Sequence, residues 1–195
     1  VKPEDSSNFE AGLKFRSPKF TAQITGFYFK GKNMIDWVKE KPEDLWESRN
    51  FTRLNKWGVE LHSSIKLAAT QLDFGFVFMD QEKDASGLIS NYVLDYLRYK
   101  LTAGLSHPIF DNLTANWQFR WQDRQGTYTR YIDATTAEET EYPAFALIDL
   151  KLNYKLEKVD IFLTANNLFN VTYYDIGNIP QPGTWIMGGI SYTIR

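Results

Sequence analysis

Apolar and polar side chains alternate in several segments of this chain, each of about ten residues. In one of them, Trp117, Phe119 and Trp121 are separated by Gln118 and Arg120. Because successive side chains of a strand point to opposite faces, the alternation predicts strands with one apolar and one polar face. The nine segments of this kind cover 9–16, 20–28, 59–66, 72–78, 97–105, 113–122, 148–156, 159–170 and 184–195. The sequence therefore predicts an all-β, antiparallel fold.

The connections between these segments alternate strictly in length. Short turns lie at 17–19, 68–71, 107–112 and 157–158, and long connections lie at about 31–49, 80–91, 126–143 and 170–184. A barrel in an outer membrane has short periplasmic turns, long extracellular loops and strands of about ten residues. The pattern therefore predicts a transmembrane β-barrel. Its first and last segments here both run from the outside towards the periplasm.

Composition is compatible with such a barrel and excludes several other classes. The mean hydropathy is −0.40 and no apolar run is long enough for a transmembrane helix. A barrel strand is apolar on one side only, so this polar mean does not exclude a barrel. The chain has no cysteine, which excludes a disulfide scaffold and a thiolate metal site. A net charge of −2 gives no reason to expect nucleic-acid binding, and we expect no cofactor.

Large aromatic side chains lie towards the ends of the predicted strands. Tyr28, Trp121 and Trp185 are near the long connections, whereas Tyr154 and Tyr192 are near the short turns. Two aromatic girdles at the membrane interfaces predict such positions. The alternative is that these aromatics pack the core of a soluble sandwich.

Short motifs in the chain resemble those of one known family. The corner Asn167–Asn170, which reads N-L-F-N, is followed by an aromatic loop and by Pro182-Gly183. This segment resembles the C-terminal end of TonB-dependent outer-membrane transporters. Further matches, in the order of the family, are Val1–Glu4 with Ser6–Gly12, Phe27–Phe29 with Ile35-Asp36, and Asn55–Leu61.

The resemblance implies both a fold and a function. The family fold is a barrel of 22 strands with a plug in its lumen, so residues 1–195 would supply about the last nine strands, without the plug. The family takes up scarce nutrients such as cobalamin or iron-siderophores across the bacterial outer membrane. The implied partners are outer-membrane lipid, the remainder of the receptor, the periplasmic TonB system through the plug, and a small organic or metal-chelate ligand. Barrel strands of this type usually end in an aromatic residue, so we expect an apolar or aromatic residue to follow Arg195.

A catalytic role is not expected from the sequence. His62 and Ser64 share a strand face, but a histidine beside a serine in a polar row is more typical of a solvated lumen than of a catalytic pair. His107 lies in a turn. Glu138, Glu139 and Glu141 lack the spacing of a calcium loop. We therefore expect a protein that is not an enzyme.

Ligand contacts are expected from the long connections and from the neighbouring strand ends. Aromatic side chains with a few polar groups suit a bulky ligand. The candidates are Asp36, Trp37, Trp46, Arg49, Asn50, Tyr128, Arg130, Tyr131, Tyr173, Tyr174, Asp175 and Gln181. Asn166, Asn167 and Asn170 are interpreted as structural, because asparagine side chains satisfy backbone groups at corners.

Two other classes of protein remain open at this point. One is a small, self-contained outer-membrane barrel with a structural or adhesive role, which would need an even number of strands. The other is a soluble β-sandwich or lipocalin-like binding protein, in which Phe74, Trp117 and Tyr154 would point into a core.

Overall fold

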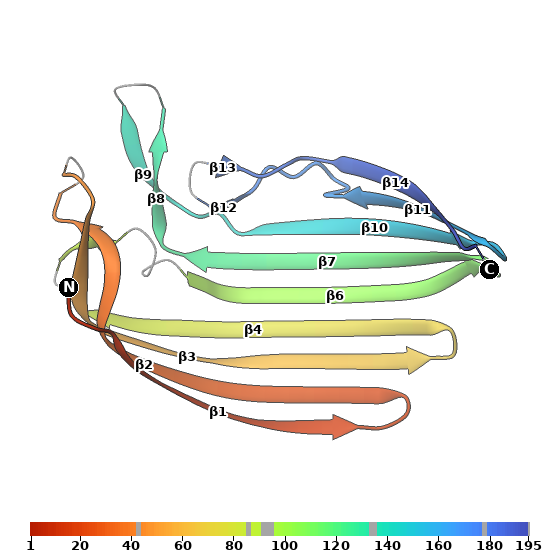
Figure 1. The fold of residues 1–195 in the computed structure, drawn as a ribbon, viewed down its shortest axis with the longest axis horizontal. Coiled ribbons are helices and arrows are strands. Elements are labelled where there is room, and N and C mark those ends of the chain that lie inside the picture. Colours follow the sequence, from red (N-terminus) through yellow and green to blue (C-terminus); the bar gives the residue numbers. More distant parts are fainter. Residues whose placement is uncertain (42–43, 85–86, 91–95, 133–135, 177–178, 195) are drawn as a thin grey trace.

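The computed structural model describes residues 1–41, 44–84, 87–90, 96–132, 136–176 and 179–194. Nine strands follow one another in a single antiparallel sheet (Figure 1), and their order along the sheet is their order along the chain. They are β1 (Asp5–Arg16), β2 (Phe20–Lys39), β3 (Glu47–Leu67), β4 (Thr70–Asp84), β6 (Tyr96–Phe110), β7 (Leu113–Gln125), β10 (Phe145–Lys155), β11 (Val159–Asn166) and β14 (Trp185–Tyr192). The prediction of nine antiparallel strands is confirmed.

Shorter strands lie beside or beyond this sheet. β5 (Ile89–Ser90) pairs with the end of β2. β8 (Thr127–Tyr131) pairs with β9 (Ala137–Glu141), and β12 (Tyr174–Ile176) pairs with β13 (Ile179–Pro180). No helix in the described part of the chain is long and apolar enough to cross a membrane. Arg195, for which the sequence raised an expectation, lies outside the described residues.

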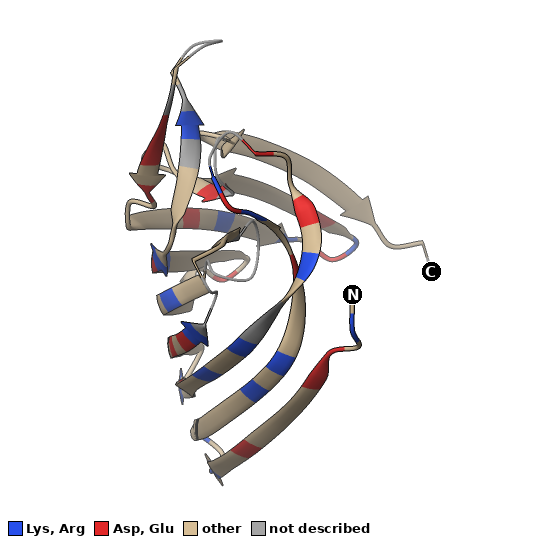
Figure 2. Ribbon diagram, turned by 90° about the vertical axis from the view of Figure 1, so that its left-hand side faces the viewer, with Lys and Arg blue, Asp and Glu red and all other residues tan. Residues whose placement is uncertain are grey.

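The sheet is curved and open. Figure 2 shows the strands following an arc whose two margins, β1 and β14, lie apart. Among the described residues β1 pairs only with β2, and β14 pairs only with β11. This single curved layer differs from a soluble sandwich, which needs two packed sheets, and from a small barrel, which needs closed edges.

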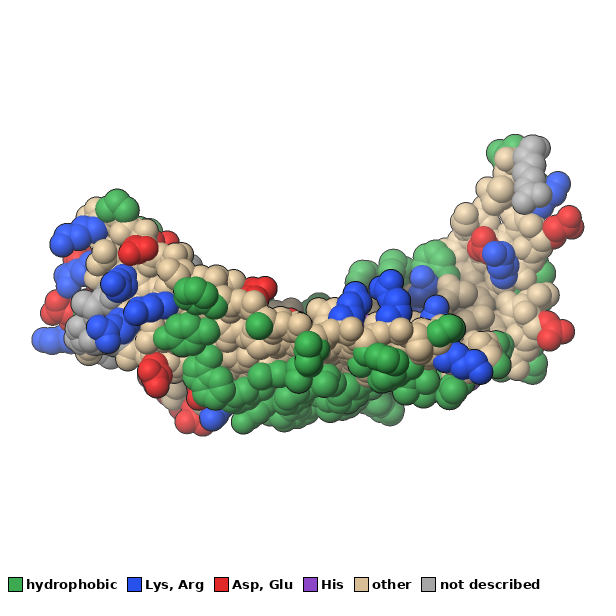
Figure 3. Space-filling model, turned by 90° about the horizontal axis from the view of Figure 1, so that it is seen from below, with side chains coloured by type: hydrophobic (Ala, Val, Ile, Leu, Met, Phe, Trp, Pro, Cys, Tyr) green, Lys and Arg blue, Asp and Glu red, His purple; other side chains and the backbone are tan. Residues whose placement is uncertain are grey.

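The convex face of the arc is apolar (Figure 3). A row of rings runs across it at one level of the sheet. The ring centroids of Trp57 and Phe78 are 5.3 Å apart, those of Phe78 and Tyr99 are 5.3 Å apart, and Tyr99 lies 6.4 Å from Trp121. The row lies at the long-connection ends of its strands, where the sequence predicted an aromatic girdle. Trp185 is not part of this row.

The reason that Trp185 is excluded is strand alternation. It pairs with Asn166, whereas its neighbour Ile186 pairs with Ala165 on the convex side. Trp185 therefore belongs to the concave side.

The concave face is polar and carries several Lys and Arg side chains (Figure 3). One register row shows how it is built. His62 of β3 pairs with Gly75 of β4, Gly75 pairs with Thr102 of β6, and Thr102 pairs with Arg120 of β7. Because directly paired residues share a face, these side chains line the hollow of the arc.

Three long connections are more regular than the sequence predicted. The segment 31–49 was expected to be a loop, but β2 and β3 remain paired beyond the sheet, from Lys32 opposite Arg53 to Val38 opposite Glu47. Alternation did not reveal this ladder, because Asp36 shares the buried side of the ribbon with Val38, whereas Trp37 is on the exposed side. Strand pairing there rests on backbone hydrogen bonds. The connections 126–143 and 170–184 likewise contain the hairpins β8–β9 and β12–β13.

Candidate functional site

Three polar side chains of β7 face the hollow near the long-connection end of the strand. They are Arg120, Gln122 and Arg124, which are spaced two residues apart and therefore share the concave face. Gln122 is only 4% exposed and pairs with Phe145 of β10, which is also buried. This depth is unusual for glutamine in a curved single sheet, and it results from the segment 170–184, which folds back over the strand.

Aromatic rings from three segments cover the two arginines. The rings of Phe145 and Tyr173 are 4.5 Å apart, and the guanidinium of Arg120 lies 5.6 Å and 5.7 Å from their centroids. Arg124 lies 5.5 Å from the ring of Tyr142. A guanidinium held over aromatic faces keeps its N–H edge available for oxyanions.

Further rings extend this cluster outwards. Tyr128 is 9% exposed. Its ring centroid lies 4.9 Å from that of Tyr142 and 5.8 Å, in a stacked arrangement, from that of Tyr174. Hairpin β8–β9 and strand β12 are thus joined through tyrosine rings above β7.

Asp175 lies at the centre of this cluster. Gln122 donates a hydrogen bond from Nε2 to Oδ1 of Asp175. One carboxylate oxygen lies 3.8 Å from a terminal nitrogen of Arg120 and the other lies 3.9 Å from one of Arg124. Nε of Arg124 is buried and has no hydrogen-bond partner within the described part of the chain. Two cations therefore share one carboxylate without forming a bidentate pair with it.

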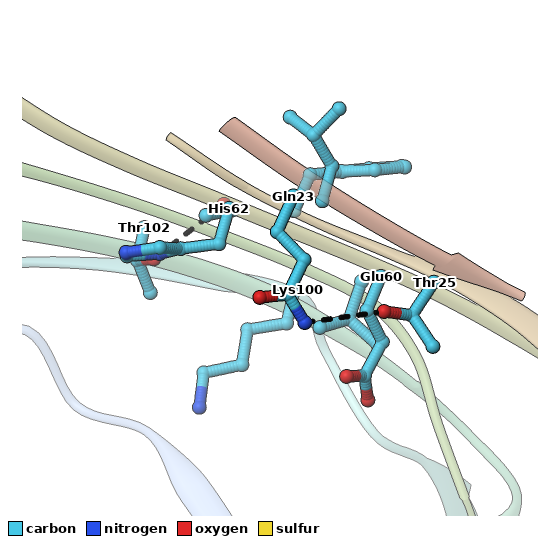
Figure 4. A pocket seen from close by; sticks show the side chains of 10 residues that line it. Gln23, Thr25, Glu60, His62, Lys100 and Thr102 are labelled. Atoms are coloured by element: carbon cyan, nitrogen blue, oxygen red, sulfur yellow. Dashed lines mark hydrogen bonds between the residues drawn. The ribbon is translucent and has the colours of Figure 1, made fainter. Parts of the chain in front are cut away.

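A polar hollow of about 240 Å³ lies beside this cluster on the same face (Figure 4). Its labelled side chains are Gln23, Thr25, Glu60, His62, Lys100 and Thr102. Gly75 leaves room between His62 and Thr102, which are its register neighbours. Lys100 pairs with Gln122, so the hollow and the arginine cluster form a continuous surface.

The segment 170–184 is held in place by a corner at the end of β11. Asn167 is 4% exposed, has a positive φ of 49° and receives a hydrogen bond from the amide of Val171. Its Nδ2 donates to the carbonyls of Val171 and Pro182, and its amide donates to Asp149. Asparagine suits this position because it tolerates left-handed backbone and bonds to nearby backbone groups. The structural role predicted for Asn167 is confirmed.

Asn170 and Gly183 complete the corner. Asn170 has a φ of 53°, and its Oδ1 accepts a hydrogen bond of 3.0 Å from the amide of Thr184. A Cβ atom at Gly183 would clash with that same Oδ1. The N-L-F-N corner and the later P-G pair thus fit one another directly.

We expect Asn167→Ala to release the segment 170–184 in the full-length protein. The substitution removes three side-chain hydrogen bonds and places alanine at positive φ, at a cost of about 2 kcal/mol. The open population should rise about thirtyfold, measured as the rate of protease cleavage within this segment on intact cells. Asn166→Ala, one residue earlier, is the control and should leave the cleavage rate unchanged. Equal rates for the two variants would contradict the structural role of the corner.

The comparisons with known proteins identify the family. The sequence matches the family described as TonB dependent receptor-like, beta-barrel, over residues 1–168. The chain belongs to this family. No curated protein sequence matches it significantly.

Solved structures of TonB-dependent receptors share the fold. The FrpB iron transporter from Neisseria meningitidis (F3-3 variant) aligns with a TM-score of 0.75 at 20% identity, covering 98% of this chain and 31% of its own. The pyoverdine outer membrane receptor FpvA from Pseudomonas aeruginosa PAO1, bound to pyoverdine, gives a TM-score of 0.75 at 19% identity, covering 99% and 30%. The copper transporter OprC gives 0.76 at 16% identity, covering 100% and 32%. The chain thus spans about a third of these receptors, and its open arc is part of a barrel.

Within this receptor barrel, the candidate residues predicted from the sequence fall into two groups. Tyr128, Tyr173, Tyr174 and Asp175 come together over β7. The backbone of Gln181 closes the same segment, since its amide donates a 2.9 Å hydrogen bond to the carbonyl of Tyr173. Arg130 lies further out on β8, 3.7 Å from Glu138, on the same hairpin as Tyr131, whose side chain lies outside the described residues.

The second group lies on the β2–β3 ribbon. Asp36 is buried at 4% exposure, whereas Trp37 is 50% exposed. The side chain of Asn50 ties β3 to the N-terminal segment, because the backbone amide of Lys2 donates to Oδ1 of Asn50 and Nδ2 of Asn50 donates back to the carbonyl of Lys2. Trp46 lies under the ammonium of Lys39, 4.7 Å from it.

Two groups of charged or titratable side chains lie on these outer segments: Arg49 with its two glutamates, and Tyr96 with Asp80. Hydrogen bonds to Glu40 and then to Glu47 raise the pKa of Arg49, so this ribbon carries a closed ion-pair network. Near the outer ends of β4 and β6, the pKa of Tyr96 is raised to about 12, mainly by burial and also by the hydrogen bond to Asp80. The same hydrogen bond lowers the pKa of Asp80. These contacts join neighbouring segments near the strand ends.

Sequence reasoning missed the β7 side chains and two of the rings. Arg120 and Gln122 were interpreted only as the polar face of a strand, Tyr142 only as part of a connection, and Arg124 and Phe145 lay outside the predicted segments. The available signal was the pair of arginines four residues apart, next to the aromatic connection 126–143.

Proposed function

We propose that this chain is the C-terminal part of a transporter in a bacterial outer membrane, which takes up a scarce nutrient with energy from the TonB system. The chain supplies barrel wall and extracellular segments. The remainder of the receptor, which includes the plug in this family, supplies the coupling to TonB. The membership of the family and the iron, pyoverdine and copper proteins that share the fold support this proposal.

The observation that carries the proposal is the chemical difference between the two faces of the arc. Its convex face is apolar and bears a row of rings, as a surface in lipid requires. Its concave face bears arginines, tyrosines and a polar hollow, as a ligand path requires. A structural or adhesive barrel needs the first face but has no use for a buried cluster of this kind on the second.

The ligand class we propose is a small organic molecule or a metal chelate, of the size of an iron-siderophore or cobalamin. Stacked rings bind flat or bulky organic surfaces, and guanidinium groups bind carboxylate or phosphate groups. Catalysis is not part of the proposal, because no nucleophile in the cluster is paired with a base. Tyr128, Tyr173 and Tyr174 would contact the ligand directly.

The test is uptake by the full-length receptor, expressed in a bacterium that lacks its own receptors for iron chelates and cobalamin. Radiolabelled cobalamin and a panel of ferric chelates with catecholate, hydroxamate or carboxylate groups serve as substrates. We expect energy-dependent uptake of one class, which stops when a protonophore collapses the proton gradient. Tyr173→Ala should weaken binding of that substrate about tenfold. Tyr154→Ala, on the convex face, is the control and should not change it.

Two results would count against the proposal. Uptake that continues after collapse of the gradient indicates a passive channel. Adhesion to host or matrix components in the absence of any uptake indicates the structural barrel.

A further inference from the structure

The cationic cluster on β7 has more positive charge than the chain places against it. Arg120 and Arg124 both face the concave side of the arc. Within the described part of the chain, Asp175 is the carboxylate that forms ion pairs with these arginines. One carboxylate between two guanidinium groups leaves a site for a second anion.

The contacts of Asp175 with the arginines are long. Distances of 3.8 Å and 3.9 Å exceed those of a charge-assisted hydrogen bond, which are about 2.7–2.9 Å. Among the described residues, only Gln122 makes a short contact with the carboxylate. The buried Nε of Arg124 adds a donor that has no partner among those residues. The donors of the cluster thus remain largely unused while Asp175 is in place.

The arginines themselves are held in fixed orientations. Arg120 lies over both Phe145 and Tyr173, and Arg124 lies over Tyr142. Rings that cover the guanidinium faces direct the N–H edges towards the position of Asp175. A pre-oriented pair of this kind binds an oxyanion without a large loss of side-chain entropy.

We propose that Asp175 is an internal substitute for an anionic group of the ligand. A ligand carboxylate, or a similar oxyanion, displaces Asp175 from Arg120 and Arg124 and thereby releases strands β12 and β13. This inference rests on the proposed transport function and names the chemistry of the ligand at the same site. No bond is formed or broken, because one carboxylate exchanges for another.

The displacement couples binding to movement of the segment. Tyr173 and Tyr174, which precede Asp175, pack on Phe145 and Tyr128. When the carboxylate leaves the cluster, these two rings lose the anchor beside them. The Asn167 corner is independent of Asp175, so it remains as the fixed end of the segment.

The test uses the full-length receptor in detergent, with a spin label at Ile179→Cys on β13, where the native side chain is 53% exposed. This chain contributes no other cysteine. Succinate is the probe, at constant ionic strength, and succinamide is its uncharged analogue. We expect succinate to mobilise the label and succinamide to leave it unchanged. A label at Phe169→Cys, beside the corner, is the positional control and should respond to neither.

Two variants separate displacement from a general effect of anions. In Asp175→Asn the label at position 179 should already be mobile, and succinate should bind roughly fivefold more tightly, since no internal carboxylate competes. In the double variant Arg120→Gln, Arg124→Gln, succinate should have no effect. Equal responses to succinate and succinamide, or a label in Asp175→Asn as immobile as in the native receptor, would overturn the proposal.

The outcome is separable from that of the transport experiment. If no substrate is taken up but the label responds as expected, the transport function fails and the displacement stands. If uptake is observed and the label does not respond, only the displacement fails.

Discussion

Prepared by itself and transferred from denaturant into buffer without detergent, the 195-residue chain is expected to aggregate. The sheet exposes 13252 Å², whereas a globular protein of 22.7 kDa exposes about 9,500 Å². The excess is apolar in large part. Leu13, Leu163 and Ile190, for example, are 78%, 48% and 73% exposed on the convex face. An apolar surface of this extent is stable only against lipid, detergent or another protein.

The open edges of the sheet also favour aggregation. Every residue of β1 is exposed, and the outer backbone groups of β1 and β14 have no strand beside them in the described part of the chain. Such edges pair with other chains. We therefore expect most of the protein to sediment in water. Detergent should keep it in solution but should leave it heterogeneous, because detergent covers the face and not the edges.

Sedimentation and light scattering with and without detergent would check this expectation, with the full-length receptor as the control. The full-length receptor should be monodisperse in detergent, since its edges are paired. A monodisperse chain that unfolds cooperatively in plain buffer would contradict the interpretation of the convex face as a lipid surface.

The strands could be predicted because two media act on them. A side chain such as Phe119 faces the apolar side, and its neighbour Arg120 faces the polar side. Apolar and polar residues therefore alternate in the sequence of the strand. The ribbon that continues β2 and β3 past Lys32 was interpreted as a loop, although its backbone pairing is continuous. Its buried side carries Asp36 and its exposed side carries Trp37, so the usual alternation is absent there.

The site could be predicted only in part. Tyr173, Tyr174 and Asp175 stand out as an aromatic and polar cluster in a long connection. The side chains that they meet depend on the fold-back of that connection over β7. Contacts between Asp175 and Gln122 join residues far apart in the chain, and no local pattern marks them. Arg120 was therefore interpreted as one polar-face residue among several, and Arg124 lay just beyond the predicted strand.

The curved sheet requires glycine at position 58 of β3. Gly58 faces the crowded concave side, where it pairs with Phe27 of β2. A Cβ atom built at Gly58 would clash with the backbone carbonyl of Phe78 on β4 and would lie 2.6 Å and 2.9 Å from ring atoms of Phe27. A ring can rotate away, but a carbonyl of the neighbouring strand cannot move without disturbing the ladder. The close approach of β3 and β4 thus requires glycine at this position.

We expect Gly58→Val to prevent most of the full-length receptor from reaching its folded form. Overpacking against the backbone should cost about 3 kcal/mol, and strand pairing between β3 and β4 would be disturbed while the barrel forms. The amount of folded receptor in outer membranes, detected as the species that changes its electrophoretic mobility only after heating, should fall at least about tenfold.

Gly26→Val is the matched control. It introduces the same side chain on the adjacent strand, where the nearest atoms to a Cβ are 3.9 Å and 4.0 Å away. Because Gly26 lies on the convex face, the added valine would meet lipid and should leave the folded amount within about twofold. If both variants fold equally well, β3 and β4 are not in the close contact described here, and the register from Arg53 opposite Asp84 to Leu67 opposite Thr70 would have to be shifted.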